Sequence, residues 1–121
     1  MANEATLAPL GERDAAALER LGALGHETRL AAVRLLVARA PEALPAGRIA
    51  VALGVRENAL SPHLDRLVRA GLIARRRAGR EILYAADLEG VSGLLAFLLE
   101  DCCGGRPELC GPWPGDEEKR G

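Results

Sequence analysis

Three cysteines lie close together near the end of the chain, at Cys102, Cys103 and Cys110. Thiolates are soft ligands, and three of them without a nearby histidine suit a soft ion that accepts three-coordinate geometry. Trivalent arsenic forms such a pyramid, and trivalent antimony fits the same donors. Structural zinc usually takes four ligands, so zinc or cadmium would need a fourth from Glu108, Asp101 or water. We therefore interpret the three thiols as ligands for arsenite or antimonite, with zinc and cadmium as alternatives.

The spacing of the cysteines requires a change of backbone direction after the adjacent pair. Side chains of neighbouring residues in a helix point about 100° apart, so Cys102 and Cys103 cannot easily chelate one atom inside a helix. Gly104 and Gly105 follow directly and give the backbone freedom to adjust. The segment 104–109 can form a loop that returns Cys110 to the pair. The same arrangement also suits a thiol redox switch, in which the pair oxidises with the third cysteine.

A second group of chemically active residues is basic. The segment from Arg56 to Glu81 contains seven arginines and three acidic residues, a net charge of +4, whereas the whole chain carries −1. A basic segment in a nearly neutral protein indicates a polyanionic partner. Four of the arginines lie in the stretch 75–80, between two short apolar segments around Leu72-Ile73 and Ile82–Tyr84. Because Gly79 suits a turn position with positive φ, this stretch predicts a β-hairpin with an arginine-rich turn.

A short helix must precede this hairpin. Its apolar residues recur at the spacing of a helix with one buried side, and they are Leu60, Leu64, Leu67 and Val68. Gly71 can end the helix in the left-handed conformation. The start of the helix has two alternatives. Asn58 is a good N-cap but places Pro62 inside the helix, whereas Ser61 as the cap places Pro62 at the first helical position.

The rest of the chain predicts further helices. Ala15–Leu24 forms a first helix, and Glu27–Ala38 forms a second, whose expected buried stripe is Leu30, Val33 and Val37. Pro45–Leu53 forms a third, closed by Gly54, and the succession of helix, glycine turn and helix indicates a helix-turn-helix unit. A last helix runs from Asp87 to about Asp101. Its apolar stripe is too extensive for a lone surface helix and predicts a partner helix; it consists of Leu88, Val91, Leu95 and Leu98.

Composition sets the broad class. The chain has 121 residues, 49% hydrophobic and 2% aromatic, which predicts one domain with a core of aliphatic residues, mainly helical. No apolar run reaches the roughly 18 residues of a membrane span, and no secretory signal is evident, so we expect a cytoplasmic protein with reduced thiols. We divide the chain into a flexible N-terminus (1–11), a helical domain with a hairpin (12–101) and a cysteine-containing tail (102–121). No Cys-x-x-Cys, phosphate loop or Ser/His/Asp constellation is visible, which argues against an enzyme.

Together these residues resemble the winged helix-turn-helix core of the ArsR/SmtB repressors, over roughly residues 12–101. The resemblance rests on Leu60-Ser61-Pro62-His63-Leu64, Ala70-Gly71-Leu72-Ile73, Arg77-x-Gly79-Arg80 and Tyr84. It implies a fold that is mainly α, with about five helices and a β-hairpin wing. It also implies a homodimer that represses transcription by binding double-stranded operator DNA and that leaves the DNA when a metal ion or metalloid binds.

The resemblance also implies roles for individual residues. In this family the recognition helix lies in the major groove and the wing lies at the DNA backbone, and the first and last helices join the dimer. The candidate DNA contacts are Arg56, Asn58, Ser61, His63, Arg66, Arg69, Arg77 and Arg80. The candidate dimer contacts are Leu18, Leu21, Leu88, Val91, Leu95 and Leu98.

The chain departs from the family at two familiar sensing sites. The stretch Ile49–Val55, where the founding arsenic repressors carry their cysteine motif, contains no cysteine. The last helix contains no histidine, although the zinc-sensing members carry Asp and His pairs there. Sensing is therefore expected to depend on Cys102, Cys103 and Cys110, as in members with a vicinal cysteine pair after the last helix. A redox-sensing or a zinc- or cadmium-sensing repressor of the same fold remains the alternative.

Overall fold

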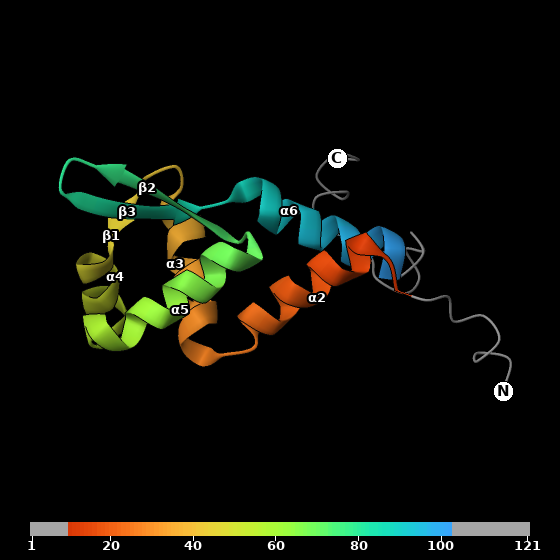
Figure 1. Cartoon of the computed structure of the whole chain (residues 1–121), viewed down its shortest axis with the longest axis horizontal. Coiled ribbons are helices and arrows are strands. Elements are labelled where there is room, and N and C mark those ends of the chain that lie inside the picture. Colours follow the sequence, from red (N-terminus) through yellow and green to blue (C-terminus); the bar gives the residue numbers. More distant parts are fainter. Residues whose placement is uncertain (1–9, 103–121) are drawn as a thin grey trace, which may run out of the picture.

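The computed structural model describes residues 10–102, which form five α-helices, a terminal π-helix and a three-stranded sheet. In chain order the elements are α2 (Glu12–Leu24), α3 (Glu27–Arg39), β1 (Leu44–Pro45), α4 (Ala46–Leu53), α5 (Glu57–Ala70), β2 (Ile73–Ala78), β3 (Glu81–Ala86), α6 (Leu88–Ala96) and η1 (Phe97–Cys102). Helices α3, α4 and α5 pack against the sheet, whereas α2 and α6 extend from this body at the end away from the hairpin turn (Figure 1). This arrangement confirms the predicted fold class. No helix within residues 10–102 is long and apolar enough to cross a membrane.

The turn between α4 and α5 is tight. Gly54 ends α4 in the left-handed conformation, with φ of 70°, and the amide of Val55 bonds back to the carbonyl of Ala50 at 3.0 Å. Helix α5 then begins at once, because the carbonyl of Arg56 accepts from the amide of Leu60 at 3.0 Å. Arg56 is the N-cap residue.

Both predicted starts of α5 are therefore wrong. Asn58 and Ser61 lie inside the helix, and Pro62 is an interior residue without an amide hydrogen to donate. The helix continues through this proline because its buried side holds the leucines Leu60, Leu64 and Leu67, each fully buried. Burying these side chains offsets the loss of one backbone hydrogen bond.

The sheet has the strand order β1-β3-β2, with both pairs antiparallel. The predicted hairpin is confirmed: β2 and β3 pair from Ile73 opposite Ala86 to Ala78 opposite Glu81, and Gly79 has φ of 64° in the turn. The strand β1 was not predicted. Its two residues pair with β3, so that Leu44 lies opposite Tyr84. This pairing fixes the hairpin to the segment that leads into α4.

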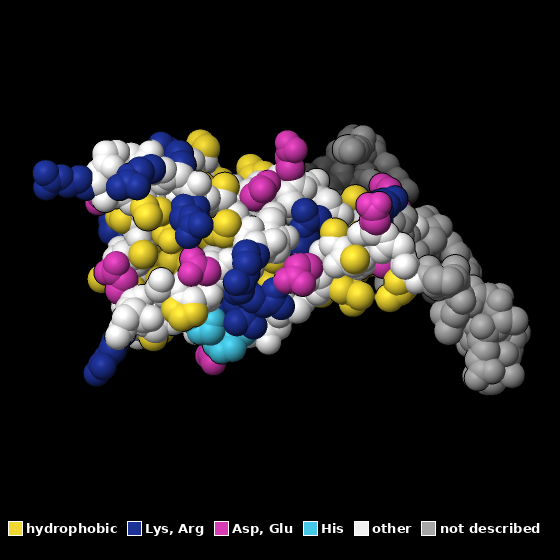
Figure 2. Space-filling model, viewed as in Figure 1, with side chains coloured by type: hydrophobic (Ala, Val, Ile, Leu, Met, Phe, Trp, Pro, Cys, Tyr) yellow, Lys and Arg dark blue, Asp and Glu magenta, His cyan; other side chains and the backbone are white. Residues whose placement is uncertain are grey.

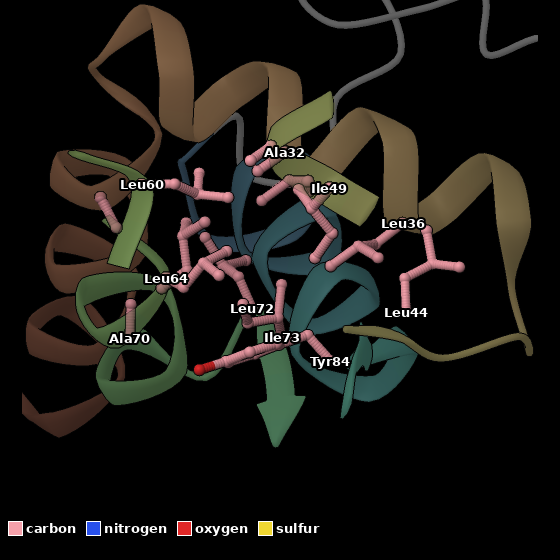
Figure 3. Packing of buried hydrophobic residues seen from close by; sticks show 14 residues of the cluster. Ala32, Leu36, Leu44, Ile49, Leu60, Leu64, Ala70, Leu72, Ile73 and Tyr84 are labelled. Atoms are coloured by element: carbon pink, nitrogen blue, oxygen red, sulfur yellow. The ribbon is translucent and has the colours of Figure 1, made fainter. Parts of the chain in front are cut away.

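The core is built from aliphatic side chains with one tyrosine (Figure 3). Its largest fully buried side chains come from α3, α4, α5 and the strands, and they are Leu36, Leu44, Ile49, Leu60, Leu64, Leu67, Leu72 and Ile73. Tyr84 on β3 closes the core at the sheet. The predicted stripe of α3 is wrong in part, because Leu30 and Val37 are exposed. Ala32, Val33 and Leu36 form the buried side, since α4, α5 and β3 pack on that side of α3.

The last helix begins as predicted and ends differently. Asp87 caps α6 by accepting from the amide of Gly90 at 3.0 Å. Gly90 lies so close to the turn after α5 that a Cβ there would be 1.7 Å from the carbonyl oxygen of Gly71. After Ala96 the helix widens into the π-helix η1, which ends at Cys102, whereas a single regular helix was expected.

Candidate nucleic-acid interface

The outward side of α5 is polar. Asn58, Ser61, Asp65 and Arg69 are exposed there, on the side of the helix away from the buried leucines. This side carries amide, hydroxyl, carboxylate and guanidinium groups, which together can bond to base edges and to phosphates. The turn at Gly54 joins α4 and α5 as a helix-turn-helix pair, and the polar side of α5 is exposed on the surface of the body.

The hairpin places its arginines on two faces. The register sets Arg75 opposite Tyr84 and Arg77 opposite Ile82, so these two arginines share the face that carries Tyr84. Arg76 points to the other face, and Arg80 lies in the turn. Figure 2 shows the basic side chains projecting from the hairpin end of the molecule. Such a projecting basic turn is suited to a DNA backbone.

A groove joins α5 to the hairpin. It has a volume of about 890 Å³ and opens between α4, the start of α5 and β3. Ser61 from α5 and Arg80 from the hairpin turn both line it, so the structure brings together two residues that the sequence placed on separate elements. Two acidic residues, Glu57 and Glu81, also line the groove and reduce its positive potential.

Arg39 and Arg48 also line this groove, although neither was predicted from the sequence. Arg39 ends α3 and forms an ion pair with Glu42 at 3.6 Å, while Arg48 lies in the first turn of α4. Neither belongs to the basic segment from Arg56 to Glu81. Only the packing of α3 and α4 beside the hairpin brings them to the groove.

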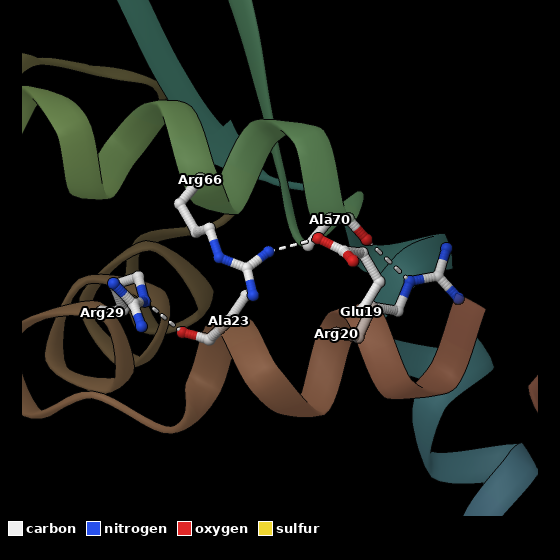
Figure 4. Close-up of polar contacts among 6 residues, drawn as sticks. All are labelled: Glu19, Arg20, Ala23, Arg29, Arg66 and Ala70. Carbon is white, nitrogen blue, oxygen red and sulfur yellow. Dashed lines mark hydrogen bonds and ion pairs between the residues drawn. The ribbon is translucent and has the colours of Figure 1, made fainter. Parts of the chain in front are cut away.

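Six of the eight predicted DNA contacts are exposed on α5, at its start or on the hairpin: Arg56, Asn58, Ser61, Arg69, Arg77 and Arg80. The other two, His63 and Arg66, are only partly exposed and lie on the flank of α5 that faces α2 and α3. Arg66 forms an ion pair with Glu19 of α2 (Figure 4). The structure thus separates these two side chains from Ser61, on the hairpin side of α5, and from Arg80 in the hairpin turn.

His63 belongs to a small polar cluster. Its Nδ1 lies 3.1 Å from Nη1 of Arg29, and its ring centroid lies 4.3 Å from that of His26. Burial lowers the pKa of His63 below its usual value, and the charges of His26 and Arg29 lower it further. Because Arg29 carries only donors, Nδ1 of His63 accepts this hydrogen bond, so the imidazole is neutral. Figure 2 shows the two histidines adjacent on the surface.

The predicted arsenite ligands lie almost wholly outside the described residues. Cys103 and Cys110 are not described, and of Cys102 only the backbone at the end of η1 is described. Within residues 10–102, no three His, Cys, Asp or Glu side chains are grouped so that they could hold a metal ion.

Most of the predicted dimer contacts are accessible. Leu18 and Leu21 on α2 and Leu88 and Leu95 on the last helix are exposed, whereas Val91 and Leu98 are half-buried. Val91 packs partly against the core of its own subunit. These leucines lie on the two helices that extend from the body, where Figure 2 also shows hydrophobic side chains. These exposed leucines form an apolar surface that a partner could cover.

Comparison with known proteins agrees with this geometry. A family model described as a helix-turn-helix domain matches residues 24–76, from the end of α2 to β2. An ArsR-like transcriptional regulator from Rhodococcus sp. RHA1 has a similar structure, with 26% identity and a TM-score of 0.66, covering 79% of this chain and 88% of that one. No curated protein matches the chain by sequence.

Two further structures are similar. One is the homodimeric winged helix-turn-helix DNA-binding domain of Mb0332 from Mycobacterium bovis, described as a possible ArsR-family transcriptional regulator; identity is 27% and the TM-score 0.55, over 78% of this chain and 91% of that one. The other is described as a possible transcriptional regulator for arsenical resistance, with 29% identity and a TM-score of 0.58, over 66% of this chain and 80% of that one. The chain thus resembles DNA-binding regulators, as expected, and not enzymes.

Proposed function

We propose that this chain, a winged helix-turn-helix transcriptional regulator of the ArsR/SmtB type, is a repressor that binds operator DNA as a homodimer. The observation that carries the proposal is the junction of the polar side of α5 with the basic hairpin, where Ser61 and Arg80 line one groove. A helix fits the major groove of DNA, and arginines beside it can reach the flanking phosphates. The proposed DNA contacts are Arg56, Asn58, Ser61, Arg69, Arg77 and Arg80.

The exposed leucines of α2 and α6 support the proposed homodimer. Leu18 and Leu95 are 56% and 42% exposed, and burying such side chains against a second copy is favourable. A symmetric dimer would present two α5 helices to half-sites roughly 34–36 Å apart on a near-palindromic operator. The homodimeric state described for the Mycobacterium bovis protein supports this assembly.

For the signal, the proposal is trivalent arsenic bound by Cys102, Cys103 and Cys110. The support is chemical: three thiols within nine residues form a soft donor set without histidine. One similar protein is described as a possible regulator for arsenical resistance. Antimonite suits the same donors. Coordination requires thiol deprotonation, so binding should strengthen as pH rises.

The course of the chain suggests how binding could reach the DNA contacts. Asp87, the N-cap of α6, directly follows β3 of the hairpin, and η1 continues α6 to Cys102. Drawing the cysteines together would reshape the end of this continuous segment, which carries the dimer contact Leu95. A coupling of about 1–3 kcal/mol between ligand and DNA is ordinary for such a switch. By linkage, operator DNA must weaken arsenite binding by the same factor.

The DNA part is tested by enriching operator duplexes from random-sequence DNA with the purified protein. Fluorescence anisotropy then measures binding to the enriched duplex with and without arsenite. We expect tight binding that arsenite weakens. Absence of any enriched duplex would refute DNA binding. Binding that peroxide abolishes and arsenite leaves unchanged would favour the redox sensor, whereas release by zinc or cadmium alone would favour the metal sensors.

The ligand set is tested with Trp113, the only tryptophan of the chain, which lies three residues after Cys110. Closure of Cys110 onto the pair should change the fluorescence of Trp113 with saturable dependence on arsenite. Cys102→Ser or Cys103→Ser should abolish tight binding. Cys110→Ser should lose the fluorescence response and retain weak binding by calorimetry. A full fluorescence response in Cys110→Ser would show that the third thiol is not a ligand.

A further inference from the structure

Helices α2 and α5 are joined by two arginine contacts that run in opposite directions (Figure 4). Arg66 of α5 reaches down to the carboxylate of Glu19 on α2. The next residue of α2, Arg20, reaches up to α5 and donates from Nε to the carbonyl oxygen of Ala70 at 3.1 Å. The two contacts join α2 to the middle of α5 and to its C-terminal end. We call the pair of contacts the α2–α5 clamp.

Each guanidinium group of the α2–α5 clamp lies close to a glycine residue. A Cβ at Gly22 would lie 3.1 Å from Nη2 of Arg66, and a Cβ at Gly71 would lie 3.2 Å from Nη2 of Arg20. The carbonyl of Ala70 is also one of the unpaired acceptors at the C-terminus of α5, where a cation is favourable. The clamp therefore combines charge with a close fit at both ends.

The C-terminal end of α2 is also held by α3, because Nε of Arg29 donates to the carbonyl oxygen of Ala23 at 2.6 Å and the half-buried Leu24 packs against the core. The buried residues of α2 are Ala17 and Ala23, both with short side chains. The leucines Leu18 and Leu21 are exposed. Because these buried side chains are short, directional polar contacts contribute to the relative orientation of the two helices. The ion pair between Arg66 and Glu19 adds little stability because both side chains are partly exposed, but it pairs one specific residue of each helix.

We propose that Arg66 and Arg20 are positioning residues, which set the angle of α5 relative to the dimerisation helix α2 without touching DNA. This inference rests on the proposed function. In a homodimer joined through α2, that angle fixes the distance and orientation between the two α5 helices. The clamp would thus determine which half-site spacing the dimer accepts. It assigns to Arg66 a role different from the DNA contact expected from the sequence.

Salt dependence distinguishes a positioning residue from a phosphate contact. Loss of one phosphate contact lowers the slope of log affinity against log salt by about one unit. Arg66→Ala and Arg20→Ala should weaken binding to the enriched operator about three- to tenfold and leave this slope unchanged. Arg69→Ala is the matched control, an exposed arginine of the same helix that should lower the slope. A slope lowered by about one in Arg66→Ala would overturn the positioning role.

Charge exchange gives the second test. Glu19→Arg and Arg66→Glu should each weaken operator binding, and the double variant, which recreates the pair in reverse, should recover to within about threefold of the wild type. A DNA contact could not be rescued in this way, because a carboxylate at position 66 would repel phosphate. A double variant no better than Arg66→Glu alone would therefore overturn the proposal.

The third test measures which spacing between half-sites the dimer prefers. This preference would not change if the two arginines only stabilised the fold. Operators lengthened or shortened by one base pair between half-sites should be rejected by the wild type and accepted more nearly equally by Arg20→Ala and Arg66→Ala. Unchanged spacing preference in both variants would contradict the inference. If the wild type bound no duplex at all, the proposed function itself would be wrong. This outcome differs from DNA binding with unchanged spacing preference, which would contradict only the positioning role. Circular dichroism confirms that each variant is folded.

Discussion

Arg75 of β2 donates a hydrogen bond from Nη1 to Oδ1 of Asp65 on α5, over 3.1 Å. The contact joins the hairpin to the helix that we propose reads the DNA. Both side chains are about half exposed, so the ion pair contributes little to stability. Its effect is on charge: Arg75 neutralises a carboxylate on the outward side of α5, which would otherwise face the phosphates of the proposed DNA partner.

This relationship predicts an asymmetric mutational response. Arg75→Ala should weaken operator binding more than Arg76→Ala does, because it also leaves Asp65 unpaired. Arg76→Ala is the matched control, because it also removes one positive charge but from the opposite face of the hairpin. Asp65→Asn combined with Arg75→Ala should recover part of the affinity, about three- to fivefold, measured by anisotropy. No recovery in the double variant would show that the pair does not govern the charge of this surface.

The hairpin arginines are expected to contact phosphates. Arg77→Ala and Arg80→Ala should each weaken binding to all duplexes similarly and lower the salt slope by about one unit. The control is Arg13→Ala, near the start of α2 at the end of the molecule away from the hairpin (Figure 1). Affinity titrations from low to high salt supply the slopes. An unaltered slope in Arg80→Ala would remove the hairpin from the DNA interface.

The exposed leucines are expected to hold the dimer. Leu95→Glu places a charge in the proposed contact between helices, and the cost of burying it should dissociate the dimer into monomers. Val51→Glu is the control, because Val51 is 83% exposed on α4 and lies outside α2 and α6. Sedimentation velocity reports the two states. A monomeric wild type, or a Leu95→Glu variant that stays dimeric, would contradict this assembly.

Gly90 is expected to be indispensable for the position of α6. Gly90→Ala places a methyl group where the carbonyl oxygen of Gly71 lies, so α6 must shift at a cost of about 1–3 kcal/mol. Gly93→Ala is the matched control on the same helix, since its Cβ would meet Nη1 of Arg20 at an ordinary 3.5 Å. That variant should be neutral or stabilise the helix by up to about 1 kcal/mol. Urea unfolding measures both, and equal stabilities would refute the close approach.

His63 should make stability depend on pH. Its pKa is lowered in the folded protein by burial and by the neighbouring His26 and Arg29, so the unfolded chain takes up the proton first. Stability should therefore be constant above the usual histidine pKa of 6.5 and fall as the pH drops below it. Thermal unfolding at a series of pH values should show a weaker decline for His63→Gln. The same decline in wild type and variant would exclude His63 as its source.

The sequence by itself determined the elements whose pattern is local. The leucine spacing on α5, the positive φ of Gly71 and Gly79 and the cap at Asp87 all follow from helical periodicity or from the conformational preference of one residue. The polar outward side of α5 and the basic hairpin, and hence most of the candidate interface, could be predicted for the same reason.

Only the tertiary structure decided how these elements face one another. The two-residue strand β1 has no periodicity of its own and exists because β3 offers it a partner. The start of α5 depends on the turn at Gly54, and the buried side of α3 depends on where α4, α5 and β3 pack. On α5, His63 and Arg66 have the same polar character as their outward neighbours. Their contacts with Arg29 and Glu19 arise because α2 and α3 lie beside that flank, which no spacing along the chain specifies.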